Sequence, residues 1–347
     1  MQINRISKEY LVFILFPLAL FYWGLIYWRN LFYHFGFFVT RSLPCPVISV
    51  GNISMGGTGK TPFVEYITKY LQSRGIRVGI VSRGYGRKTT GTVIVTDGKT
   101  KPKLWQDVGD EPFMLAHNLN NVPIVVDELR YRGGMVLVKK FKLDIIILDD
   151  GFQHRALYRN LDIVLINSKD TIQNQKLLPY GSLREPWYHL SRSDILVLTK
   201  INIHKPPGLL IRKMKETGLP IIKNTIKLDK TFRSITNDQI YLKNIKNCKI
   251  YIFSAIGDPE GFIASLNQTK MIICGEKIFP DHHNYNRLDI KKIEQMAKAN
   301  GADYLITTEK DLIKLSGFKF NIPLYAVKIR LEFHPKSKLE HYLQPFL

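Results

Sequence analysis

The chain has 347 residues, is 45% hydrophobic, and carries 50 Lys and Arg against 29 Asp and Glu, a formal net charge of +21. This length allows a large core in one to three domains. The three cysteines lie far apart without metal-ligand spacing, which excludes a disulfide framework and indicates the reduced thiols of a cytosolic protein. The charge predicts an anionic partner, and composition alone leaves open nucleic acid, a negative membrane surface and a phosphorylated substrate.

The first 40 residues differ in composition from the rest of the chain. Residues 11–28 are almost wholly apolar and rich in aromatic side chains, with Arg5 and Lys8 before them and Arg29 after them. The run has about the minimum length of a bilayer span, and no small-residue cleavage site of a secretory signal follows it. A buried core helix is one alternative. Dense aromatics between cations favour a membrane interface, so we expect residues 1–40 to form a membrane-associating helix on the cytoplasmic side.

Residues 47–62, VISVGNISMGGTGKTP, have the pattern of a phosphate-binding loop between a strand and a helix. In such a loop the glycines let backbone N–H groups face the phosphates, Lys60 reaches the β- and γ-phosphates, and the Thr61 hydroxyl ligates Mg²⁺. The general pattern has Gly where this chain has Ser54. A glycine-rich turn with a chance Lys-Thr pair is the alternative. The predicted nucleotide contacts are Ser54, Met55, Gly56, Gly57, Thr58, Gly59, Lys60 and Thr61.

Residues 144–150, DIIILDD, form the second motif. An apolar strand that ends in paired carboxylates, downstream of a phosphate loop, is typical of the Mg²⁺-holding acid in P-loop enzymes. Any apolar strand can end in Asp, so the motif gains its meaning from the loop upstream. We expect Asp149 and Asp150 to lie beside Lys60 and Thr61.

The remaining apolar runs alternate between strand and helix patterns. Strands are predicted at residues 77–82, 93–95, 123–126, 161–166, 195–198, 250–254, 271–273, 304–307 and 324–327, and helices at 63–74, 260–266 and 288–298. Residues 93–95 are expected to form a hairpin strand closed by Asp97-Gly98. The fold class is α/β: a P-loop NTPase-like parallel sheet with helices on both faces, a smaller second α/β domain, and the N-terminal helix. The expected boundaries are 1–40, 41–235 and 236–347.

Several polar clusters are candidate ligand contacts, each with a structural alternative. Residues 82–87, SRGYGR, leave the end of a strand, where open sheets bind ligands, but could be a solvated turn. Residues 109–112, GDEP, could simply favour a helix dipole. The loop at 178–187 could be only a connection. Residues 281–283, DHH, could be exposed polar residues without a role in binding. Residues 199–202, TKIN, are similar to a guanine-reading loop but have Asn202 where the acid is needed.

Taken in order, the motifs resemble those of the tetraacyldisaccharide 4′-kinases of the lipid A pathway. They are S-x-G-N-I-S-x-G-G-T-G-K-T-P, S-R-G-Y-G-R, G-D-E-P, L-D-D-G-F-Q-H, G-x-L-R-E-P, F-P-D-H-H and T-E-K-D. The resemblance extends from the apolar N-terminus to Asp311. It implies transfer of the γ-phosphate of ATP, with Mg²⁺, to the 4′-hydroxyl of a tetraacylated glucosamine disaccharide 1-phosphate. In this family Ser is tolerated at the position of Ser54.

The resemblance also implies a role for each motif residue. Asp110 accepts the proton of the attacking hydroxyl and is oriented by His282, with His283 as the other candidate for this pairing. The implied catalytic residues are Asp110, His282, Lys60, Asp149 and Asp150; the Mg²⁺ ligands are Thr61, Asp149, Asp150 and Glu111; the contacts to the lipid head group are Arg83, Tyr85, Arg130, Arg184, Glu185 and His154. Which of Asp149 and Asp150 lies nearer the metal stays open.

The implied partners are the lipid A disaccharide precursor and the cytoplasmic face of a bacterial inner membrane, where the protein is expected to be peripheral or monotopic. No nucleic-acid partner is expected, because a nucleic-acid-binding NTPase has no use for an apolar aromatic helix. The alternative function is a membrane-recruited P-loop ATPase switch of the partitioning type. Those switches carry a signature lysine just before the paired glycines, where this chain has Met55.

Overall fold

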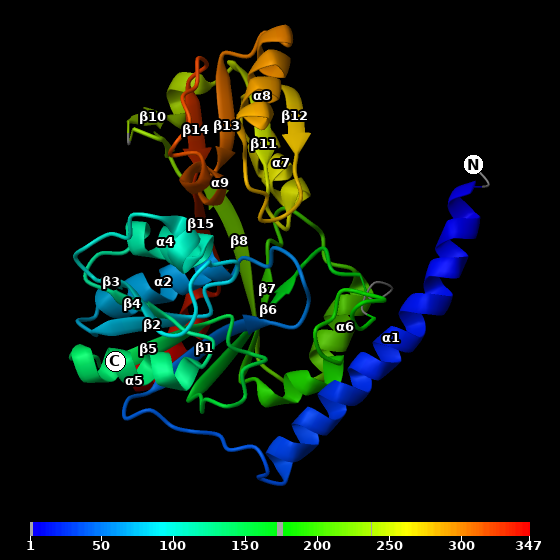
Figure 1. The fold of residues 1–347 in the computed structure, drawn as a ribbon, viewed down its shortest axis with the longest axis vertical. Coiled ribbons are helices and arrows are strands. Elements are labelled where there is room, and N and C mark those ends of the chain that lie inside the picture. Colours follow the sequence, from blue (N-terminus) through cyan, green and yellow to red (C-terminus); the bar gives the residue numbers. More distant parts are fainter. Residues whose placement is uncertain (1–2, 172–175, 237) are drawn as a thin grey trace.

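The computed structural model describes residues 3–171, 176–236 and 238–347. In this part of the chain the strands form two sheets, one of nine strands and one of six. Figure 1 shows the larger sheet in the lower half of the molecule and the smaller sheet above it, with helix α1 running along the outside. The two connections between the sheets are short: β8 leads to β9, and β14 leads to β15.

The larger sheet has the strand order β15-β8-β7-β6-β1-β5-β2-β4-β3. Its inner strands are parallel, and the edge strands β15 and β3 run antiparallel. Most inner strands are buried at every position, which explains their continuous Val, Ile and Leu runs. The strands are β1 Val47–Asn52, β2 Val78–Ser82, β3 Val93–Asp97, β4 Pro123–Val126, β5 Ile145–Asp149, β6 Leu161–Asn167, β7 Ile195–Thr199, β8 Ile221–Leu228 and β15 Ile329–His334.

Helices cover both faces of the larger sheet, as expected. Alternate residues of β1 point to opposite faces, so Ile48 belongs to the core cluster of α2 and α4 and Val47 to that of α5. The helices are α2 Lys60–Gln72, α3 Trp105–Val108, α4 Asp110–Asn118, α5 Arg130–Lys140, α6 Gly208–Glu216 and α10 Lys336–Leu343, with short 3-10 helices η2 Trp187–Arg192 and η4 Gln344–Phe346.

The smaller sheet has the order β10-β9-β14-β13-β11-β12. Phe262 of α7 packs in the core on one face, and Ile293 of α8 packs in the core on the other. The elements are β9 Thr231–Ser234, β10 Gln239–Tyr241, η3 Leu242–Ile245, β11 Lys249–Ser254, α7 Pro259–Asn267, β12 Ile272–Ile278, α8 Arg287–Ala299, β13 Tyr304–Thr308, α9 Glu309–Lys314 and β14 Leu324–Val327.

Sheet membership divides the chain differently from the expected boundary after residue 235. β9 already belongs to the smaller sheet, where it pairs with β14. At the other end, β15 pairs with β8 of the larger sheet, and Leu339 and Leu343 of α10 join the core around Phe63. The smaller sheet is therefore an insertion between β8 and β15, and the end of the chain returns to the larger sheet.

The hairpin predicted at residues 93–97 is wrong. Strand β3 pairs antiparallel with β4, and Asp97 lies opposite Pro123. The helices α3 and α4 lie between the two strands in sequence. Asp97 instead turns the chain locally, since its Oδ1 accepts the N–H groups of Lys99 and Thr100.

Helix α1 spans Ile3–His34 and is longer than the apolar run that predicted it. Within the described part of the chain, no helix combines the length and the hydropathy that crossing a membrane requires. The helix reaches the body of the protein on one side only, where Ala19 and Ile26 are buried. Tyr22 and Arg29 lie one turn after Ala19 and Ile26 respectively and make polar contacts with the body.

Candidate active site

A cavity of about 340 Å³ lies between the phosphate loop and the facing loops and helices of the smaller sheet. It is placed at the carboxyl ends of the parallel strands, where open α/β sheets bind ligands. The larger-sheet side contributes Met55, Gly56, Gly57, Thr58, Gly59, Lys60, Thr61, Pro62, Tyr85, Glu111, Met114, Asp150, Arg184, Lys200, Ile226 and Ile329. The smaller-sheet side contributes Ile256, Gly257, Asp258, Gly261, Phe262, Ser265, Asp281, His282, Thr308, Glu309, Lys310 and Val327.

The phosphate loop has the backbone that binds anions. Gly56 and Gly59 adopt φ values of 110° and 88°, and α2 begins directly after Gly59 without a side-chain cap. The first turn of α2 therefore has N–H groups free for an anion at the edge of the cavity. Gly57 packs so closely on the smaller-sheet domain that a Cβ there would lie 3.0 Å from the Cβ of Asp258. The loop thus fits a triphosphate and also touches both domains.

Ser54 has a structural position behind the loop and does not line the cavity. It is buried, and its hydroxyl donates to Asp170 Oδ2 at 3.1 Å. The next residue, Met55, donates its N–H to the carbonyl of Ser182 at 2.7 Å. These bonds attach the start of the loop to Asp170 and Ser182.

Asp149 is a fully buried carboxylate at the end of β5. Its Oδ2 accepts the Ser82 hydroxyl at 2.9 Å, and its Oδ1 has no partner among the residues that the structure describes. Burial first, and then the charges of Glu111 and Asp150, raise the pKa of Asp149 above its ordinary value. A divalent cation bound here would stabilise the ionised carboxylate of Asp149, which burial and the two neighbouring acids otherwise destabilise.

Asp150 faces the cavity instead of the core. Its carboxylate lies 3.5 Å from Lys60 Nζ and 2.9 Å from Arg184 Nη1. Burial raises the pKa of Asp150, but the Lys60 and Arg184 cations outweigh burial and lower it below the ordinary value. In the described residues no group of three or more His, Cys, Asp or Glu side chains is placed to hold a metal ion.

The G-D-E-P and D-H-H motifs meet across the cavity. Asp110 Oδ2 lies 2.9 Å from His282 Nδ1, and Asp110 Oδ1 accepts the N–H of Glu111 at 2.9 Å. His283 is instead bonded to Asp289 within its own domain at 3.0 Å. The pairing that the sequence left open is therefore with His282. Burial raises the pKa of Asp110, but the bond to His282 and the charges of Lys310 and Lys314 outweigh it and hold that pKa well below the ordinary value.

The expected head-group residues fall into two groups by position. Tyr85 and Arg184 line the cavity, and the Tyr85 ring lies 5.1 Å from the ring of His282. Arg83, Arg130 and His154 lie beside the acids but do not line the cavity. Burial, followed by Arg130 and the nearby guanidinium groups, lowers the pKa of His154 to about 4, and burial lowers the pKa of Arg130 to about 10. A neutral imidazole beside buried guanidinium groups is suited to binding an anion.

Glu185 is placed away from the cavity, contrary to what the motif implied. Its side chain is fully buried and contacts Arg29 of α1 at 2.8 Å, His189 at 2.8 Å and Arg192 at 2.6 Å. Burial raises the pKa of Glu185, but these partners outweigh it and lower it to about 2. Glu185 therefore anchors α1 to the body of the protein.

The sequence interpretation missed five charged residues of the site. Lys200 donates to the carbonyl of Gly57 at 2.6 Å and also contacts Asp258, which Lys169 contacts at 2.5 Å. Lys310 and Lys314 surround Asp110. Lys200 lies in the TKIN motif and Lys310 in the T-E-K-D motif, but neither motif predicted which residues these lysines contact.

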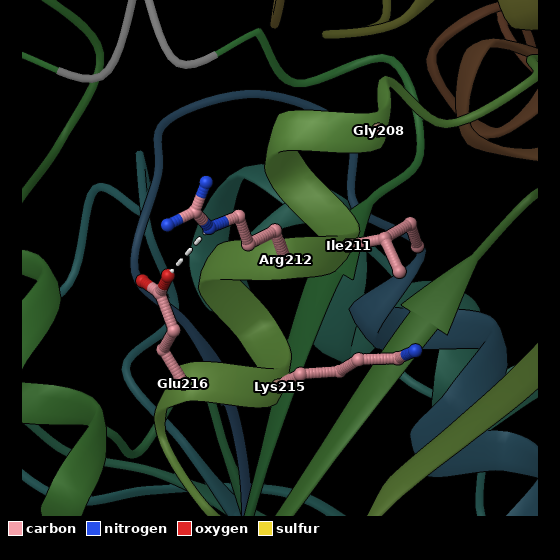
Figure 2. Close-up of a pocket in the computed structure, with 5 residues that line it drawn as sticks. All are labelled: Gly208, Ile211, Arg212, Lys215 and Glu216. Carbon is pink, nitrogen blue, oxygen red and sulfur yellow. Dashed lines mark hydrogen bonds and ion pairs between the residues drawn. The ribbon is translucent and has the colours of Figure 1, made fainter.

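A second hollow, of about 530 Å³, lies on α6 far from these residues. Its lining residues Gly208, Ile211, Arg212, Lys215 and Glu216 all come from that one helix (Figure 2). Figure 2 also shows the contact from Arg212 Nε to Glu216 Oε1, which is 2.9 Å long and exposed. This hollow is lined by α6 alone and contains none of the groups that line the cavity at the phosphate loop.

Replacing Asp258 with Ala is expected to lower the free energy of unfolding by about 3–5 kcal/mol, because it leaves Lys200 buried without its acid. As a matched control, Glu216→Ala breaks the exposed pair with Arg212 and should cost under ~1 kcal/mol. Chemical denaturation measures both. Equal losses in the two variants would contradict the assignment of Asp258 as a buried anchor.

The Asp258 pair also predicts a pH dependence. Burial raises the pKa of Asp258, but Lys200 and Lys169 outweigh it and lower it to about 2, below the ordinary value of 3.8. Because the folded pKa is the lower one, this stabilisation is fully present above pH ~4 and is lost as the pH falls toward 2. Between these pH values the wild type should lose more stability than Asp258→Ala loses.

The chain is similar to known proteins over nearly its whole length. The family model described as Tetraacyldisaccharide-1-P 4'-kinase (LpxK) matches residues 11–347. The chain belongs to this family. The tetraacyldisaccharide 4'-kinase of Desulfotalea psychrophila is 38% identical over 93% of this chain and 94% of its own length. That of Aquifex aeolicus is 38% identical over 93% of this chain and 96% of its own.

A solved member of the LpxK family has the same fold. The crystal structure of the "apo" form of LpxK from Aquifex aeolicus in complex with ATP superposes with a TM-score of 0.78 at 35% identity. The match covers 95% of this chain and 98% of that one. Membership of the LpxK family decides against the alternative of a partitioning switch, in agreement with Met55 at the place of the signature lysine.

Proposed function

We propose that the protein transfers the γ-phosphate of ATP to the 4′-hydroxyl of a tetraacylated glucosamine disaccharide 1-phosphate, a step of lipid A synthesis. The observation that carries this proposal is the pairing of Asp110 with His282 beside the phosphate loop. ATP binding alone does not require such a pair. A proton acceptor at the loop is needed when a hydroxyl attacks the phosphate.

The phosphate end of the cavity suits the donor nucleotide. Lys60 would bind the β- and γ-phosphates, aided by the N–H groups of residues 56–61. The phosphates of bound ATP would also replace Asp150, which lies 3.5 Å from Lys60 Nζ, as the partner of Lys60. Thr61, Asp149, Asp150 and Glu111 are the residues that would hold Mg²⁺. When bound, Mg²⁺ neutralises charge that develops on the transferring phosphoryl group.

Asp110 would be the proton acceptor of the reaction. As the acceptor oxygen bonds to the γ-phosphorus, its proton passes to the Asp110 carboxylate, and the bond from the γ-phosphorus to the β–γ bridging oxygen breaks to release ADP. A carboxylate that cations hold ionised is always ready to accept a proton but is a weak base. Phosphoryl transfer through a loose transition state does not require a strong base. Positioning of the reactants therefore supplies most of the catalysis.

The acceptor's anionic head group would bind at the guanidinium groups beside Asp150. Arg184 lines the cavity, and the exposed Arg83 and the buried Arg130 are near enough to His154 to lower its pKa. Planar guanidinium groups bind phosphate through paired hydrogen bonds, which suits a sugar 1-phosphate. Tyr85 would contact the sugar near His282. Glu185 has no part in this contact, because its oxygens are bound to Arg29, His189 and Arg192.

A direct assay tests the proposal. Purified full-length protein, γ-labelled ATP, Mg²⁺ and tetraacyldisaccharide 1-phosphate in detergent micelles should give a labelled lipid, and ATP turnover should require the lipid. ATP turnover that proceeds without lipid, or that DNA or a partner protein stimulates, would overturn the proposal and favour a switch.

The exposed side of α1 supports a peripheral membrane location at the cytoplasmic face of the inner membrane. The side toward the protein buries Ala19 and Ile26 and makes polar contacts through Tyr22 and Arg29. The outward sides carry large apolar residues, among them Phe13 and Phe21, which are 78% and 68% exposed. An amphipathic helix that packs only on a protein has the opposite pattern. Exposed aromatics of this kind favour burial in the lipid interface, close to an acylated substrate.

Replacing Phe13, Phe21 and Trp28 together with Ser should weaken binding to anionic vesicles at least tenfold, because it removes apolar area from the interface. Flotation with full-length protein in high salt measures this, since salt suppresses the contribution of the basic charge. The matched control replaces Leu209 and Leu288, which are also exposed but lie on α6 and α8. Equal binding of both variants and wild type would contradict this location.

A further inference from the structure

Lys310 lies where four charged or titratable groups converge. Its Nζ is 3.2 Å from His282 Nε2, 3.4 Å from Glu111 Oε1, 3.5 Å from Asp281 Oδ1 and 3.8 Å from Asp110 Oδ2. The side chain is 15% exposed and lines the cavity. It comes from the T-E-K-D motif, for which neither the phosphate loop nor the proton acceptor gave a role.

The first turn of α9 holds Lys310 in this position. Thr308 caps the helix, and its hydroxyl is bonded to Asp311 Oδ2 at 2.7 Å. Asp311 is fully buried and also accepts the N–H of Ala255 at 3.1 Å and the hydroxyl of Tyr285 at 3.0 Å. These bonds fix the turn that presents Lys310, which is the support that a precise site needs.

The hydrogen bonds around His282 assign its tautomer. An ammonium group can only donate, so Nε2 accepts from Lys310 and carries no proton. In a neutral imidazole the proton is then on Nδ1, which lies 2.9 Å from Asp110 Oδ2 and donates to it.

We propose that Lys310 is a positioning residue that fixes His282 as the Nδ1–H tautomer and so orients the Asp110 carboxylate for the acceptor hydroxyl. This inference rests on the proposed function and adds a residue to it. With Oδ2 occupied by His282 and Lys314, Oδ1 accepts only the N–H of Glu111 in the described part of the chain. The remaining lone pair of Oδ1 is the position open to the hydroxyl.

The assignment also links catalysis to the contact between the domains. Asp110 and Glu111 lie on α4 of the larger sheet, whereas Asp281, His282 and Lys310 belong to the smaller sheet. His282 can therefore bond to Asp110 only when both domains contact each other. A hydroxyl that enters an open site would find Asp110 without its orienting bond.

Lys314 offers a matched control for a purely electrostatic role. It contacts the same Asp110 Oδ2 at 3.2 Å and is only 1% exposed. It also donates to the carbonyl of His283 at 3.3 Å, whereas His282 is not among its contacts in the residues described. Both lysines balance the charge of Asp110, but of the two only Lys310 also contacts Nε2 of His282.

The test compares full-length wild type with Lys310→Met, Lys310→Arg and Lys314→Met. The ¹⁵N resonances of labelled imidazoles report the tautomer, and His282→Gln identifies the signal of His282 among the nine histidines. We expect a protonated Nδ1 and a bare Nε2 in wild type and Lys314→Met, and loss of this preference in Lys310→Met. Lys310→Arg retains a donor and should retain the tautomer. A wild-type Nε2–H tautomer, or an unchanged spectrum in Lys310→Met, overturns the proposal.

Kinetics on the same proteins give the second measurement. Lys310→Met should lower kcat by ~10²–10³ while KM for ATP changes only a few-fold, because positioning and charge at the reacting hydroxyl are lost and the phosphate loop is intact. Lys310→Arg should recover part of kcat. An unchanged kcat in Lys310→Met overturns the role. Absence of lipid phosphorylation in wild type would refute the proposed function instead, whatever tautomer the spectrum gives.

Discussion

Lys60→Ala and Asp149→Asn should each lower kcat by ~10²–10⁴, the largest single losses expected in this protein. Lys60 is the only Lys of the phosphate loop sequence, and Asp149 has a buried oxygen without a partner in the described residues. Both act on charge that develops at the transferring phosphoryl group. Since the predicted metal ligands include Asp149, its Asn variant should also require more Mg²⁺ for half-maximal activity.

The two variants should keep the fold, and Asp149→Asn should not lose stability. Burial and the neighbouring acids raise the pKa of Asp149 in the folded protein, so its charge opposes folding at neutral pH. An uncharged amide of the same shape removes that cost, as at other sites where function opposes stability. Thermal unfolding and kcat measured on the same samples test both statements.

Lys69→Ala is the control for Lys60→Ala, because the exposed Lys69 lies on the same helix. Its partner Glu65 is buried but keeps a second cation, Lys328, at 2.8 Å. Lys69→Ala should leave kcat unchanged and cost under ~1 kcal/mol. Near-normal turnover of a folded Lys60→Ala variant would remove the phosphate-loop assignment.

The sequence predicted the parts of the site that follow single strands. A buried strand has a continuous apolar run, and the residues after β1 and β5 must meet at one edge because the strands are parallel neighbours. Lys60 and Asp150 could therefore be placed together before any coordinates. The Asp110 and His282 pairing came from the family resemblance, since no periodic pattern connects residues 172 positions apart.

The sequence did not predict which charged residues are buried. Glu185 and Lys200 belong to motifs that look like surface loops, and Asp258 belongs to none, yet each side chain is buried among opposite charges. The local sequence shows that a segment is polar but not which residue each charged side chain will contact. For these three residues, partners come from another domain or from α1. The same reason explains the return of β15 to the larger sheet, since its pairing with β8 spans the whole smaller sheet.

Asp110→Ala should lower kcat by ~10²–10⁴ and leave KM for ATP nearly unchanged, because the residue acts on the acceptor hydroxyl and not on the nucleotide. His282→Ala should act on the same step through its bond to Asp110 Oδ2. His283→Ala is the matched control: the neighbouring residue is bonded to Asp289 and should leave kcat within a few-fold of wild type.

The decisive measurement is the double variant Asp110→Ala, His282→Ala at saturating ATP and lipid. If His282 serves only to orient Asp110, its removal has no effect in a protein that already lacks Asp110. The double variant should therefore be little slower than Asp110→Ala alone. Stability has to be measured beside kcat, because Lys310 and Lys314 lose an acid in every Asp110 variant. Losses that multiply would mean that the two residues act independently, in which case His282 contacts the substrate itself and the orienting bond is not its role.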